Sequence, residues 1–109
     1  MSFEFGGTMQ YITIVRGRLK DADQAAAQKA HDTIVDSVRP LGDPLGAVGH
    51  QAYADVQDPG GFVAIDRWSN IEGLMQFLGN PTVGAQLGSM FDGAPDVTVL
   101  AEREGWRAF

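Results

Sequence analysis

Cysteine is absent from the 109-residue chain, and its absence excludes several kinds of chemistry. Without thiols the protein has no disulfide, no thiolate nucleophile, no Fe–S cluster and no Cys-based zinc site. Basic residues are also few, since 8 Lys and Arg stand against 14 Asp and Glu and the net charge is −6. Because phosphate groups bind Lys and Arg clusters, this balance argues against a nucleic-acid partner and against an anionic membrane surface.

Long apolar runs are missing as well. None approaches the ~20 residues that a membrane helix needs, so we expect no membrane partner. The start "MSFEFGGT" carries Glu4 and no basic stretch, which is unlike a signal peptide. We therefore expect a cytoplasmic protein, with residues 1–8 as a flexible lead-in and residues 9–109 as a single domain.

Histidine is scarce, with only His31 and His50 in the chain. Neither belongs to an H-x-x-x-H or H-E-x-x-H pair, so the sequence predicts no metal site. His31 and Asp32 are adjacent and should not share a helix face, which also argues against a metal site. As a lone His on a helix stripe, His31 is expected to be a packing residue. The 14 glycines include no G-x-G-x-x-G and no G-K-[ST], so we expect no nucleotide cofactor, and no cofactor of any kind.

Six segments have regular patterning, and they alternate between strand-like and helix-like composition. In order they are a strand at 9–19, a helix at 21–42, a strand at 45–56, a strand at 62–68, a two-part helix at 69–91 and a strand at 94–106.

The ends of these segments carry start and stop signals. Asp21 or Asp23 can cap the first helix, and "RPLG" should end it. "QDPGG" predicts the turn of an antiparallel hairpin between the second and third strands. Ser69 and Glu72 have capping-box spacing, and "NP" at 80–81 predicts a restart of the second helix.

The order βαββαβ predicts an α+β, ferredoxin-like domain. Its sheet should be antiparallel and four-stranded, with both helices on one face. Because both faces of "FVAIDRW" are largely apolar, we expect a second copy of the chain to cover the other face. We assign Val63 and Ile65 to the helix side, and Asp66 and Trp68 to the partner sheet or a cavity between the two sheets.

The segment "FVAIDRWSNIEGL" and the "NPTV" restart resemble the dimeric α/β-barrel superfamily, in its antibiotic-biosynthesis-monooxygenase-like branch. That branch shows an apolar strand, an acid, one spacer and Trp, followed by a helix that opens with a small polar residue and an acid. Asp66, Trp68, Ser69 and Glu72 match these positions. The resemblance implies a homodimeric barrel, and it covers about residues 9–100. Haem-degrading members carry a His on the second helix, and none lies between residues 71 and 91 here.

His50 and Asp66 are the candidate catalytic residues. His50 lies on the strand that should pair with the strand of Asp66, and His is the commonest general base. Asp66 is either a proton relay or the partner of an Arg across the dimer. The candidate substrate-binding residues are aromatic or flexible apolar side chains, each of which is alternatively a packing residue: Tyr11, Tyr53, Phe62, Trp68 and Met75.

The resemblance implies a cofactor-independent monooxygenase acting on an aromatic or polyketide-like molecule held between sheet and helices. A cyclase or isomerase would need the same base without oxygen. A non-catalytic ligand-binding or stress-associated dimer would need only the cavity. We also expect the tail "EREGWRAF" to pack across the dimer, so that its truncation weakens the dimer.

Overall fold

The computed structural model describes residues 9–109, and the lead-in predicted for residues 1–8 lies outside this range. Its elements are β1 (Tyr11–Arg18), α1 (Gln24–Gly42), the 3-10 helix η1 (Asp43–Leu45), β2 (Ala47–Asp55), β3 (Asp58–Trp68), α2 (Ile71–Leu78), α3 (Pro81–Gly88) and β4 (Asp96–Ala101). No helix in residues 9–109 has the length and apolar character needed to cross a membrane.

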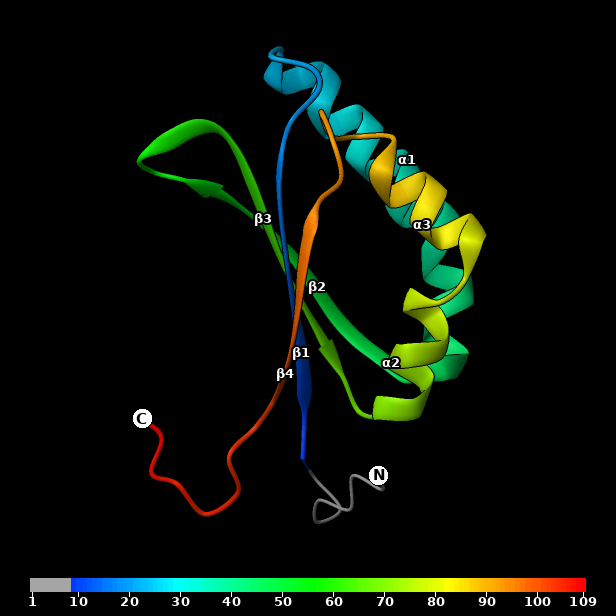
Figure 1. Ribbon diagram of the computed structural model, residues 1–109, viewed down its shortest axis with the longest axis vertical. Helices are drawn as coiled ribbons and strands as arrows, with labels where there is room; N and C mark the ends of the chain where they lie inside the picture. The colour runs from blue at the N-terminus through cyan, green and yellow to red at the C-terminus, as the bar shows by residue number, and fades with distance from the viewer. Residues whose placement is uncertain (1–8) are drawn as a thin grey trace.

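The four strands form one antiparallel sheet in the order β2-β3-β1-β4. Helices α1, α2 and α3 all lie against one face of this sheet, and the chain after β4 runs away from them (Figure 1). This is the α+β, ferredoxin-like βαββαβ architecture that the sequence predicts, with the second helix divided into α2 and α3.

The helix starts follow the sequence with one exception. Asp23 caps α1 by accepting a hydrogen bond from the Ala25 amide, and Asn80 caps α3 with Pro81 as its first residue. The capping box of Ser69 is wrong, because Asn70 is the N-cap of α2. Ser69 instead donates from its Oγ to the Gly46 carbonyl, which fixes the loop after η1.

Three boundaries differ from the prediction. α1 begins at Gln24 rather than at residue 21, and the 3-10 helix that follows its end at Gly42 was not predicted. The hairpin turn is confined to residues 56–57, because β3 already begins at Asp58 and includes Pro59. β4 ends at Ala101 because its pairing with β1 ends there.

The face assignment of β3 is wrong. Asp66 and Trp68 point toward the helices, where Trp68 packs in a buried cluster with Tyr11 and Leu74. Val63 and Ile65 therefore lie on the open face. The alternation of side chains along β3 showed which residues share a face. It could not show which of the two faces lies against the helices, because both are apolar.

Two buried clusters hold the helices on the sheet. One joins Val15 and Ala64 of the central strands to Met90 and Phe91, which follow α3. The other joins Trp68 to α2, where the Trp68 and Phe77 rings lie 5.0 Å apart between centroids. The candidate site lies in a cavity that residues of both clusters line.

Candidate functional site

A cavity of about 360 Å³ lies between the sheet and the helices. Its walls are mostly apolar, with Val35 and Val38 from α1, Phe62 and Trp68 from β3, and Phe77 from α2. Its volume falls within the range of small-molecule sites, and apolar walls with a few polar groups are their usual composition.

His50 and Asp66 form the polar centre of this cavity. The register of β2 and β3 places the two residues directly opposite each other, so their side chains emerge on the same face. His50 Nδ1 lies 2.5 Å from Asp66 Oδ1. A carboxylate can only accept, so the imidazole donates its Nδ1–H and its Nε2 points away from Asp66.

Thr13 holds the other oxygen of Asp66. Its hydroxyl donates to Asp66 Oδ2 over 3.0 Å, and β1 places Thr13 opposite Asp66 in the sheet. Thr13 is buried, whereas the Asp66 side chain is 23% exposed. Three strands thus fix the orientation of the His50 ring through Asp66, whose two oxygens are bonded to His50 and Thr13 within the single chain.

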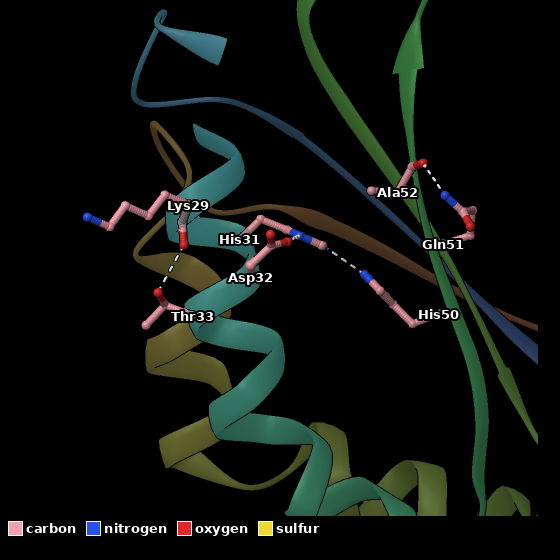
Figure 2. Close-up of polar contacts among 7 residues, drawn as sticks. All are labelled: Lys29, His31, Asp32, Thr33, His50, Gln51 and Ala52. Atoms are coloured by element: carbon pink, nitrogen blue, oxygen red, sulfur yellow. Dashed lines mark hydrogen bonds and ion pairs between the residues drawn. The ribbon is translucent and has the colours of Figure 1, made fainter. Parts of the chain in front are cut away.

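His31 reaches the same centre from α1. Its Nε2 lies 2.8 Å from His50 Nε2, and its Nδ1 lies 2.9 Å from Asp32 Oδ1. Figure 2 shows the two imidazoles pointing toward each other from the helix and the strand. His31, which was expected to be a packing residue, thus has a polar contact at each ring nitrogen, and one of these is with Asp32, with which it was not expected to share a helix face.

The pairing of residue 31 with residue 50 left no signal in the sequence. It depends on how α1 packs on the sheet, which local patterning does not determine. The scarcity of histidine is the one feature that could have prompted the pairing, because both histidines of the chain meet here. Within residues 9–109, no three His, Asp or Glu side chains are arranged to hold a metal ion.

The predicted substrate-binding residues divide into two groups. Phe62 and Trp68 line the cavity, and Tyr11 is packed beneath it in the cluster with Trp68. Tyr53 and Met75 lie outside the cavity walls and are about half exposed. Tyr53 pairs with Val63 on the open face of the sheet, and α2 buries Leu74 rather than Met75.

Solved structures share this fold. SnoaB, a cofactor-independent oxygenase from Streptomyces nogalater, is 12% identical with a TM-score of 0.63, over 87% of this chain and 94% of that one. A candidate antibiotic biosynthesis monooxygenase from Caulobacter crescentus CB15 is 17% identical with a TM-score of 0.66, over 90% and 93%. Rv0793 from Mycobacterium tuberculosis is 22% identical with a TM-score of 0.60, over 87% and 96%.

The chain thus has the fold of antibiotic-biosynthesis-monooxygenase-like proteins, which confirms the predicted resemblance at the level of the fold. No protein-family model matches the sequence, and neither does any curated protein.

Proposed function

We propose that the protein is a small enzyme that removes a proton from an aromatic or polyketide-like molecule and lets the resulting anion react with oxygen without a cofactor. One observation carries this proposal: His50 is held by Asp66 at the wall of an apolar cavity of about 360 Å³. A base that is oriented by a carboxylate is the arrangement used for general base catalysis.

His50 takes the proton on Nε2. Asp66 stabilises the imidazolium that forms, because its carboxylate already accepts the Nδ1–H. The Thr13 hydroxyl keeps that carboxylate in place. The apolar walls around Phe62 and Trp68 exclude water, so a carbanion or phenolate in the cavity is not rapidly reprotonated.

Oxygen supplies the oxidising equivalents. At an activated methylene group, the carbanion transfers electrons to O2 and a C–O bond forms, giving a hydroperoxide once the outer oxygen takes up a proton. Loss of one water molecule then leaves a carbonyl, so that CH2 and O2 become C=O and H2O. The fold that this chain shares with SnoaB supports this reaction class.

We also propose that the working unit is a homodimer. The open face of the sheet carries a continuous set of partly exposed apolar side chains. They are Ile12 and Ile14 of β1, Tyr53 of β2, Val63 and Ile65 of β3, and Leu100 of β4. A second copy placed on this face would bury it, which is the usual solution for an apolar sheet surface.

Oxygen uptake with a panel of hydroquinones and activated methylene ketones tests the function. We expect the wild type to consume one O2 per product, and His50→Gln to lower kcat by roughly 10²- to 10⁴-fold. Gln51→Ala is the matched control, because Gln51 lies next to His50 on β2 but its side chain points to the other face.

The same experiment separates the competing functions. Turnover that continues without oxygen would identify a cyclase or isomerase that uses the same base. Compounds that bind but are not converted, with or without His50, would identify a ligand-binding protein.

A further inference from the structure

The two histidines meet edge to edge across the cavity wall. Their ring centroids are 5.1 Å apart, their planes differ by 22°, and the Nε2 atoms are separated by 2.8 Å. At this N–N distance, stacked rings are excluded, so each Nε2 points along the line that joins the rings. The contact has the length of a hydrogen bond.

The carboxylates determine where the protons lie. Asp66 accepts from His50 Nδ1, and Asp32 accepts from His31 Nδ1. Each ring therefore carries its own proton on Nδ1, and the two Nε2 atoms face each other. Two lone pairs would repel at 2.8 Å, so a hydrogen bond between these atoms needs one further proton between the rings.

This arrangement leaves no open Nε2 on His50 in the unliganded chain. A ligand oxygen that bonds both rings must move them apart, because Nε2 atoms separated by 2.8 Å leave no space between them. The group that fits is one that donates a proton to one ring and accepts a hydrogen bond from the other. An acidic hydroxyl does both, whereas a carbonyl or an ether only accepts.

We propose that His31 is the second functional imidazole of the site, and that the ligand binds through a phenol or enol hydroxyl inserted between the two Nε2 atoms. The inference rests on the proposed function, for which it specifies the substrate class. The hydroxyl proton passes to His50 Nε2, and the bridging proton stays on His31. The oxyanion then lies between two imidazolium rings, each backed by a carboxylate, and no covalent bond to the protein forms.

The surroundings of His31 agree with this role. Phe62 lies beside it, with ring centroids 5.9 Å apart, so an aromatic ring that carries the hydroxyl meets an apolar wall. The His31 side chain is 20% exposed and that of Asp32 is 60% exposed. Asp32 thus connects the His31 side of the pair to bulk water.

Binding of 4-nitrophenol tests the inference, because its phenol and phenolate forms have different colours. We expect the wild type to bind it with the absorbance of the phenolate at a pH where the free probe is mostly neutral. His31→Gln should lose this signal and weaken binding by roughly 10- to 100-fold, the range for one charge-assisted hydrogen bond. Its methyl ether, 4-nitroanisole, should bind both proteins equally weakly.

Thr33→Val is the matched control on α1, because the Thr33 hydroxyl bonds only the Lys29 carbonyl one turn away, as Figure 2 shows. It should bind the probe like the wild type, and circular dichroism should show all variants folded. Failure of the wild type to bind, binding of the neutral phenol, or unchanged binding by His31→Gln would each overturn the inference.

This readout is independent of oxygen chemistry. If the wild type binds the phenolate but consumes no oxygen, the role of His31 stands and the oxygenase proposal fails. If His50→Gln alters binding and His31→Gln does not, the proposed role of His31 is wrong, but the proposal that His50 is the general base is unaffected.

Discussion

The reactivity of the site depends on a series of side-chain contacts that begins at an exposed residue of α1 and ends at a buried residue of the sheet. Asp32 contacts His31, His31 contacts His50, and His50 contacts Asp66. The last member is Thr13, which is buried and therefore has a fixed hydroxyl. Removing the Thr13 hydroxyl should misorient the base while the His50 and Asp66 side chains themselves stay unchanged.

Thr13→Val tests this positioning role. The substitution keeps the shape of the side chain but removes the donor to Asp66 Oδ2, so the carboxylate can rotate and the His50 ring is less well held. We expect kcat to fall about tenfold with KM little changed, which corresponds to one neutral-to-charged hydrogen bond. Steady-state kinetics measures both constants.

Thr13→Ser is the matching rescue variant, because it restores the hydroxyl and loses only a methyl group. Activity near the wild-type level in Thr13→Ser would support the hydrogen bond as the cause. Equal losses in both variants would instead point to packing at this buried position.

At the scale of the elements, a close contact between η1 and α2 helps to position the cavity wall. Gly73 in the first turn of α2 lies against the backbone of Leu45, and an added Cβ would be 1.8 Å from the Leu45 carbonyl oxygen. Only a residue without a side chain fits there. This contact sets the direction of α2, which carries Phe77 and Leu78 to the cavity wall.

Gly73→Ala should therefore destabilise the protein. We expect the free energy of unfolding to fall by about 1–3 kcal/mol or more, because backbone rather than a flexible side chain must move. Gly84→Ala on α3 is the matched control, since a Cβ there meets nothing within 4 Å. It should raise stability by roughly 0.5–1 kcal/mol through the lower backbone entropy cost of Ala. Urea unfolding of both variants decides between these expectations.

The elements were largely predictable from the sequence, and the site only in part. The Asn80-Pro81 restart and the six-element order follow from local chemistry, and His50 was placed on the strand that pairs with Asp66. Two features depend on tertiary packing instead. Because both faces of β3 are apolar, the sequence did not show which face carries Asp66, and only the packing of α1 on the sheet brings His31 to His50.

At the scale of the whole molecule, the main feature is the open face of the sheet, where apolar side chains are not covered by any of the three helices. Its apolar residues lie on the side away from the three helices, and the C-terminal chain extends on the same side (Figure 1). Trp106 is 71% exposed in the single chain, with the Arg103 guanidinium 4.6 Å from its ring centroid. That the tail packs across a dimer stays a prediction.

Ile65→Lys tests the proposed homodimer. Ile65 lies in the middle of the open face, and a charge there would have to be buried without a partner in a sheet-to-sheet interface. We expect sedimentation velocity to show a dimer for the wild type and a monomer for Ile65→Lys. Val56→Lys, at the exposed hairpin turn, adds the same charge and should remain dimeric. A monomeric wild type would contradict the proposal.

The central claim is that His50 removes a proton from the substrate, and hydrogen exchange measures this step directly. An activated methylene ketone that the protein binds is incubated in D2O without oxygen, and NMR follows the loss of its acidic hydrogen. The account predicts exchange at least about 10²-fold faster than in buffer with the wild type, and a rate near that of buffer with His50→Gln. Equal exchange by the wild type and His50→Gln would contradict it.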